Sequence, residues 1–117
     1  MSESRRVTVA TTQFACLTDR ATNIERAEVL VRRAAAAGAN VILLQELFET
    51  PYFCIDQDAR HFALATTVDE NPALRHFAPI ARELGVVLPI SFFERAGQAF
   101  FNTVAMLDAD GRVLGTY

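Results

Sequence analysis

The sequence predicts an α/β fold with a mixed sheet, and three observations point to it. An apolar run at 41–44 is typical of a buried strand, and a strand-like and a helix-forming segment precede it. Strand, helix and strand at this spacing form a right-handed crossover, so the two strands should be nearly parallel. Two later apolar runs flank Asp108-Ala109-Asp110-Gly111, which indicates an antiparallel hairpin. The 117 residues suit one globular domain or a piece of a larger one.

The N-terminal half is expected to supply the crossover. Val7–Phe14 alternates β-branched and small residues, as a first strand does. Thr22–Glu25 matches a capping box, which predicts a helix that starts there and runs to about Ala37. Gly38 is suited to a left-handed helix end. The second strand, Val41–Leu44, should be buried on both faces.

The middle of the chain is expected to be a long loop followed by a second helix. Leu47–Glu70 keeps no hydrophobic period and contains at most a short helix near Ala59–Leu64; such long loops tend to be functional. Asn71-Pro72 is a cap followed by a first-turn proline, and Gly85 should end that helix.

The C-terminal half should supply the antiparallel strands. Val86–Phe93 is a further buried strand in which Pro89 predicts a bulge or an unpaired position. The hairpin strands are expected at Phe100–Leu107 and Arg112–Tyr117, with Gly111 taking a positive φ.

Composition narrows the class of protein. A net charge of −3 argues against a nucleic-acid partner, and no apolar run reaches the ~20 residues that a membrane span needs. The polar N-terminus predicts no secretory signal. The spacing of Cys16 and Cys54 fits neither a zinc site nor a disulfide framework, which favours the cytoplasm. All 11 basic residues are arginine, so a mechanism that needs lysine cannot be completed by this chain alone.

Glu46 is the principal candidate for chemistry. It follows a buried strand at the end where open α/β sheets bind ligands, so it is either a structural cap or a catalytic base whose pKa is raised. Tyr52 and Phe53 either anchor the loop or form an aromatic wall over this carboxylate.

Other residues offer weaker candidates. A Cys54–His61 pair oriented by Glu46 is conceivable, although both cysteines are better interpreted as small buried hydrophobes. His61 and His76 are expected to be solvated. Glu49 and Glu94 should be solvated too, unless either attracts a cationic substrate group.

Several blocks together resemble the nitrilase (carbon–nitrogen hydrolase) superfamily. The broad resemblance rests on Val9–Phe14, Gly38–Phe48 and Asn102–Ala105. A narrower resemblance, to amidases that act on N-carbamoylputrescine, rests on Gln45–Glu49 with Tyr52–Cys54 and on Ser91–Glu94.

The resemblance implies an α-β-β-α sandwich and a Glu-Lys-Cys triad. Only the glutamate matches, at Glu46, and Tyr52 becomes a substrate-binding candidate, whereas Asn102 is interpreted as structural. The lysine and the nucleophilic cysteine are expected beyond Tyr117, so residues 1–117 would be the N-terminal part of one hydrolase domain. The resemblance implies no metal or organic cofactor, a carbamoylated amine as small-molecule substrate, and a cytosolic homo-oligomer.

Two alternatives stay open. The first is that the chain is part of another amidase of the superfamily, such as a β-ureidopropionase-like enzyme. The second is that it is an inactive fragment that acts as an interaction module. Half a sandwich leaves apolar surface exposed, so a module of this kind would need a partner to cover it.

Overall fold

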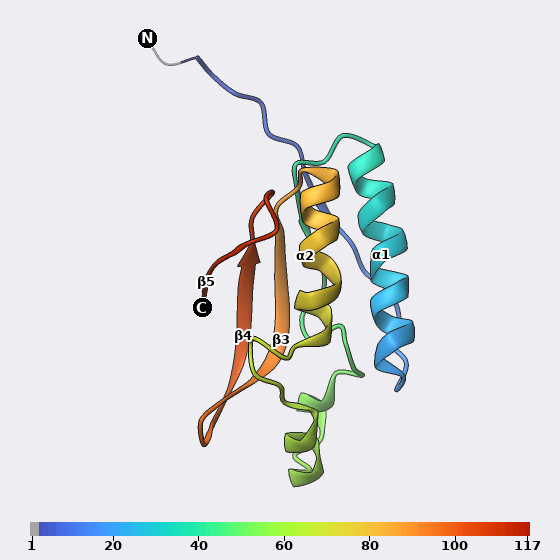
Figure 1. Cartoon of the computed structure of the whole chain (residues 1–117). Helices are drawn as coiled ribbons and strands as arrows, with labels where there is room; N and C mark the ends of the chain where they lie inside the picture. Colours follow the sequence, from blue (N-terminus) through green and yellow to red (C-terminus); the bar gives the residue numbers. More distant parts are fainter. Residues whose placement is uncertain (1–2) are drawn as a thin grey trace.

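The computed structural model describes residues 3–117 as one helical layer on one face of a strand layer (Figure 1). The elements in chain order are β1 Val9–Thr11, α1 Arg20–Ala36, β2 Val41–Leu43, the 3₁₀ helices η1 Phe53–Ile55 and η2 Ala59–Leu64, α2 Pro72–Leu84, β3 Leu88–Ala96, β4 Ala99–Leu107 and β5 Val113–Thr116. Within the described residues, neither helix is long and apolar enough to cross a bilayer.

The strands confirm the predicted mixture of parallel and antiparallel pairing. β1 pairs with β2 in parallel, and β3, β4 and β5 pair antiparallel in that order. A single parallel bridge between Val41 and Val87 joins the two sets. In this bridge the amide of Ile42 donates to the carbonyl of Val87 at 3.0 Å, and the amide of Val87 donates to the carbonyl of Asn40 at 2.9 Å.

Pro89 explains why the parallel pairing stops after one bridge. The next bond would run from the amide of residue 89 to the carbonyl of Ile42, and proline has no amide hydrogen. The β3–β4 ladder passes through Pro89, opposite Met106, in continuous register. The structure therefore contains the unpaired position rather than the bulge, and it lies on the β2 side of the strand.

Helix α1 begins earlier than the capping box predicted, so that expectation was wrong. Asp19 is the N-cap: its carboxylate accepts from the amide of Thr22 at 3.1 Å and from its hydroxyl at 2.5 Å. Thr22 is thus inside the helix. The other end agrees with the prediction, because Gly38 follows the last turn with φ +98°.

The hydrophobic core lies between the two helices and one face of the strands. The fully buried large side chains include Phe48, Phe77, Phe92, Ile42, Leu88, Ile90, Leu107 and Val31. Leu43, which points to the opposite side of β2 from Ile42, is 47% exposed. The expectation of burial on both faces was therefore wrong: the helices cover one face, and the second face is open.

The second helix and the hairpin match their sequence signals. Asn71 caps α2 by accepting from the amide of Leu74 at 2.9 Å, and Gly85 ends it with φ +65°. At the β4–β5 turn Gly111 has φ +86°, and a Cβ there would lie 2.6 Å from the carbonyl oxygen of Ala78. This contact brings the hairpin turn against α2.

Candidate active site

Glu46 lies in a tight turn just beyond β2, on the open face of the sheet. The turn is unusual because Leu47 has φ +52°, a conformation that non-glycine residues rarely adopt. The amide of Leu47 donates to the hydroxyl of Ser91 at 2.9 Å, which ties the turn to β3. The side chain of Glu46 is exposed, so this chain does not bury the carboxylate as an aromatic wall would.

Asn102 on β4 holds the carboxylate in place. Its Nδ2 donates to Oε1 of Glu46 at 2.5 Å, although the two residues lie 56 positions apart in the sequence. Both line an open hollow of about 330 Å³, together with Leu43, Leu44, Ser91, Thr103, Val104 and Tyr117. Asn102, interpreted as structural from its motif alone, therefore contacts the principal candidate residue.

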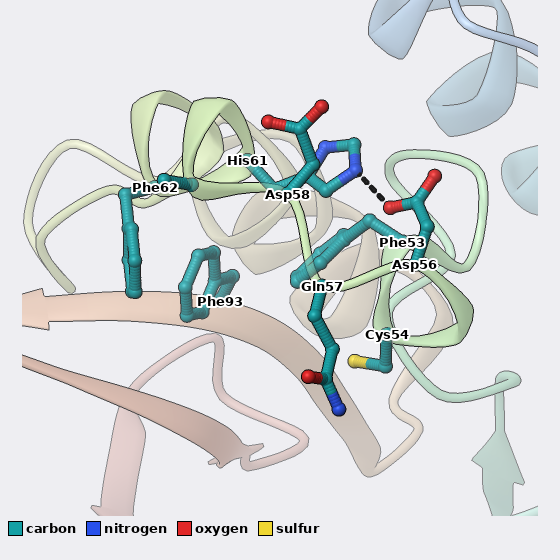
Figure 2. A pocket seen from close by; sticks show the side chains of 9 residues that line it. Phe53, Cys54, Asp56, Gln57, Asp58, His61, Phe62 and Phe93 are labelled. Atoms are coloured by element: carbon teal, nitrogen blue, oxygen red, sulfur yellow. Dashed lines mark hydrogen bonds and ion pairs between the residues drawn. The ribbon is translucent and has the colours of Figure 1, made fainter.

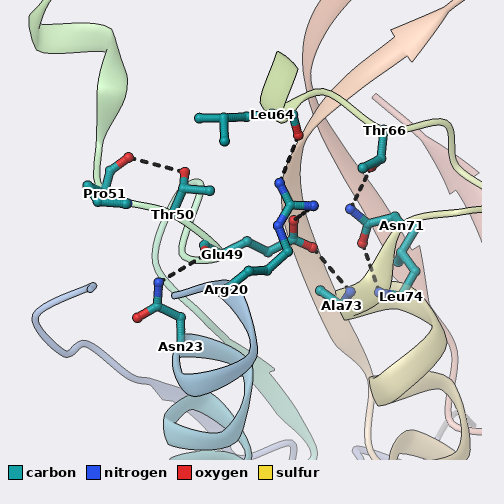
Figure 3. Close-up of polar contacts among 10 residues, drawn as sticks. All are labelled: Arg20, Asn23, Glu49, Thr50, Pro51, Leu64, Thr66, Asn71, Ala73 and Leu74. Carbon is teal, nitrogen blue, oxygen red and sulfur yellow. Dashed lines mark hydrogen bonds and ion pairs between the residues drawn. The ribbon is translucent and has the colours of Figure 1, made fainter. Parts of the chain in front are cut away.

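The same turn continues into a buried carboxylate, Glu49, which the sequence analysis expected to be solvated. That expectation was wrong: Glu49 is 5% exposed and forms an ion pair with Arg20 at 3.2 Å. Its Oε1 also accepts from the amide of Ala73 in the first turn of α2 at 3.1 Å (Figure 3). Desolvation by burial raises the pKa of Glu49, and the nearby charge of Arg20 opposes that rise.

A further bond of Arg20 and the side chain of Asn23 complete the network around Glu49. Nη2 of Arg20 donates to the carbonyl of Leu64 at 2.8 Å, which attaches the end of η2 to α1 (Figure 3). Nδ2 of the buried Asn23 donates to the carbonyls of Glu49 at 2.9 Å and Leu17 at 2.6 Å. The 46–50 turn is therefore held by both helices through polar contacts.

Gln45 fixes the other side of the turn. Its side-chain amide donates to the carbonyl of Phe14 and accepts from the amide of Phe14, both at 2.7 Å. It also donates to the sulfur of Cys16 at 3.2 Å, and that thiol donates to the carbonyl of Phe48 at 3.2 Å. Burial raises the pKa of Cys16, which suits a packing role rather than a nucleophile.

Tyr52 lies near Glu46 and is half-exposed. The pKa of its hydroxyl is raised chiefly by the charge of Glu46 and then by Cys54. Repulsion of the phenolate by a neighbouring negative charge explains this direction. Tyr52 is therefore close enough to the Glu46 carboxylate to feel its charge.

The structure does not form the Cys54–His61 pair that was conceivable from the sequence. Nε2 of His61 bonds Oδ1 of Asp56, and the thiol of Cys54 is exposed (Figure 2). His76 is not simply solvated either, because its Nε2 lies 2.6 Å from Oε2 of Glu28.

Glu94 is only partly solvated. Its carboxylate accepts from the hydroxyl of Thr103 at 2.7 Å, within the β3–β4 ladder. The bond satisfies one carboxylate oxygen within the sheet, so Glu94 is less available to a substrate cation than a solvated residue would be.

Comparison with known proteins identifies the family. The family model described as "Carbon-nitrogen hydrolase" matches residues 8–117. An N-carbamoylputrescine amidase of Solanum lycopersicum is 50% identical over 115 residues, which cover 98% of this chain and 38% of that protein. A citrullinase of Francisella tularensis is 40% identical over 111 residues, covering 95% of this chain and 39% of that protein.

The fold comparison agrees with the sequence comparison. A carbon-nitrogen hydrolase from Helicobacter pylori G27 superimposes with a TM-score of 0.85 at 29% identity, covering 95% of this chain and 38% of that one. The chain thus spans about two-fifths of the length of these relatives. The chain belongs to the carbon-nitrogen hydrolase family.

Proposed function

We propose that this chain supplies the general base of an amidase that hydrolyses N-carbamoylputrescine to putrescine, carbon dioxide and ammonia, a step of polyamine synthesis. The observation that carries the proposal is 50% identity over 98% of the chain to a protein named for that reaction. The exposed carboxylate of Glu46, held by Asn102 beside an open hollow, supports the same assignment.

In the proposed mechanism Glu46 moves protons in both half-reactions. It takes the proton of a cysteine thiol, whose sulfur attacks the ureido carbon, and it passes that proton to the departing ammonia. It then removes a proton from the water that cleaves the thiocarbamoyl bond, which regenerates the thiol. The carbamic acid released from the enzyme breaks down to the free amine and carbon dioxide.

We propose that the remaining two triad members lie outside these 117 residues. The chain has no lysine, and a lysine is what the family resemblance implies for stabilising the oxyanion. Cys16 is engaged with Gln45 and Phe48, and Cys54 lies on the loop after the turn. We therefore propose that the 117-residue chain has no amidase activity by itself. From the family resemblance we also propose that the complete enzyme is a cytosolic homo-oligomer.

A second candidate is a related amidase for a ureido amino acid. The 40% identity to a protein named citrullinase favours it, and a β-ureidopropionase-like activity belongs to the same alternative. These substrates carry a carboxylate where N-carbamoylputrescine carries only an ammonium group. A panel of N-carbamoylputrescine, citrulline and 3-ureidopropionate separates the candidates by their kcat/KM values.

The test of the general base is Glu46→Gln in an enzyme of the relatives' length that contains this segment. We expect ammonia release to fall at least about 10³-fold, because the proton acceptor is lost in both half-reactions, while the thermal unfolding midpoint stays close to that of wild type. Glu25→Gln, an exposed acid on α1, is the matched control. Turnover near the wild-type rate by Glu46→Gln would exclude Glu46 as the base.

A further inference from the structure

A second hollow lies between the two 3₁₀ helices and β3 (Figure 2). Its volume is about 290 Å³. Its lining includes three aromatic rings, two carboxylates and an imidazole: Phe53, Phe62, Phe93, Asp56, Asp58 and His61. We call it the aromatic hollow.

The rings form a continuous aromatic surface. The centroid of Phe93 lies 4.9 Å from that of Phe53 and 6.1 Å from that of Phe62. Phe62 in turn lies 4.6 Å from Phe100 on β4, and it is 51% exposed. Aromatic faces that are open to solvent attract organic cations.

The charged groups give this surface a negative balance. Asp56 and Asp58 both line the hollow, whereas Arg60, which pairs with Asp58 at 2.5 Å, does not. Among the described residues, the hollow is therefore lined by two carboxylates and by no guanidinium. The side chain of Asp56 is 66% exposed, and only its Oδ1 bonds His61, so its Oδ2 can face the ammonium group of a ligand.

The aromatic hollow adjoins Glu46 through the register of the sheet. Phe93 on β3 is the direct partner of Asn102 on β4, so both side chains emerge on the same face, with Cβ atoms about 5 Å apart. Asn102 is the residue that binds the Glu46 carboxylate. Tyr52 is a second connection, because the charge of Glu46 raises its pKa and it directly precedes Phe53 and Cys54, which line the hollow.

We propose that the aromatic hollow binds the protonated amine at the far end of an ω-aminoalkyl urea while the ureido group lies at Glu46. This inference rests on the proposed function and assigns the part of the site that recognises the amine. Aromatic faces beside two carboxylates suit an alkylammonium chain, and the same carboxylates repel a substrate that ends in a carboxylate.

The first test measures binding without turnover. The 117-residue chain is titrated with butane-1,4-diamine and, separately, with 4-ureidobutanoate, and aromatic proton shifts are followed by NMR. We expect the diamine to shift the Phe53, Phe62 and Phe93 rings and the carboxylate compound to leave them in place. Asp56→Asn should weaken diamine binding about fivefold, whereas Asp69→Asn, which removes an exposed charge outside the hollow, should leave it unchanged.

The second test separates this inference from the proposed function. In an enzyme of the relatives' length, Asp56→Asn and Phe93→Leu should each raise KM for N-carbamoylputrescine about fivefold or more and leave kcat nearly unchanged, while KM for the uncharged butylurea stays constant. Wild-type enzyme that fails to hydrolyse N-carbamoylputrescine overturns the proposed function. Normal turnover with unchanged KM in both variants overturns the aromatic hollow as the amine site, as do equal diamine affinities for Asp56→Asn and wild type.

Discussion

Asn102 and Glu46 are joined by a 2.5 Å hydrogen bond that links the middle of β4 to the turn after β2. Asn102 donates to Oε1, so it orients the carboxylate that we propose as the general base and leaves Oε2 free of this bond. A hydrogen bond to a charged group is stronger than one between neutral groups.

Replacing Asn102 should therefore impair turnover more than folding. We expect Asn102→Ala in an enzyme of the relatives' length to lower kcat about 10-fold or more, because the carboxylate loses its orientation. Gln98→Ala, an exposed amide in the β3–β4 turn, is the control; equal effects of the two substitutions would argue against a positioning role for Asn102.

The Arg20–Glu49 ion pair predicts a loss of stability when its cation is removed. Arg20→Met removes the cation that pairs with Glu49, whose exposure is only 5%. The unpaired buried carboxylate should destabilise the fold by about 2–4 kcal/mol. Urea unfolding at pH 7 measures this loss. Arg26→Met on the exposed side of the same helix is the control, and a loss no larger than that of the control would show that the pair contributes little.

The same carboxylate predicts a pH effect of defined sign. Burial raises the pKa of Glu49 in the folded protein above its usual 4.5, so the folded state binds this proton more tightly than the unfolded state. The free energy of unfolding of wild type, relative to that of Glu49→Gln, should consequently increase as the pH falls from neutrality towards 4.5. Unfolding curves of both proteins between pH 7 and 5 measure the difference, and a gap that narrows on acidification would contradict the raised pKa.

Two substitutions on α1 distinguish the observed N-cap from the capping box. Asp19→Ala should lower the unfolding midpoint by roughly 4 °C, because the amide of Thr22 loses its acceptor. Glu25→Ala should change it little, although a capping box would make Glu25 important. The hydrogen bonds from Thr22 lower the pKa of Asp19 from 3.8, so this stabilisation is present above that pH and is lost on further acidification.

Alanine substitutions at three glycines compare two sources of lost stability, an unfavourable backbone φ and a steric clash of the added Cβ. Gly111→Ala should destabilise the fold by about 2–3 kcal/mol, because φ is +86° and the added Cβ would lie 2.6 Å from the carbonyl of Ala78. Gly97→Ala, with φ +62° and open space, should cost about 1 kcal/mol. Gly115→Ala should stay within about 0.5 kcal/mol, and unfolding by urea ranks the three. A different order would show that the Ala78 contact relaxes without cost.

Local signals in the sequence were sufficient for most of the secondary structure. The crossover, the Asn71 cap, the two helix-ending glycines and the Asp108–Gly111 turn depend on neighbouring residues, so they are readable without knowing the fold. The capping box was misread because Asp19, one turn earlier, competes for the same amide of Thr22. Pro89 was expected to leave one position of its strand without a hydrogen bond. Which neighbouring strand would lack that bond depends on the order of strands in the sheet, which the sequence does not show.

The sequence by itself determined the α/β class, the crossover, the hairpin and, through its motifs, Glu46 as the residue to examine. Tertiary structure alone decided that Glu49 is buried against Arg20, that Asn102 binds Glu46, and that Phe93 joins Phe53 and Phe62. The physical reason is range. Caps and turns are set by contacts within a few residues, whereas these relationships depend on strand register and helix packing, which bring together residues that are distant in the chain.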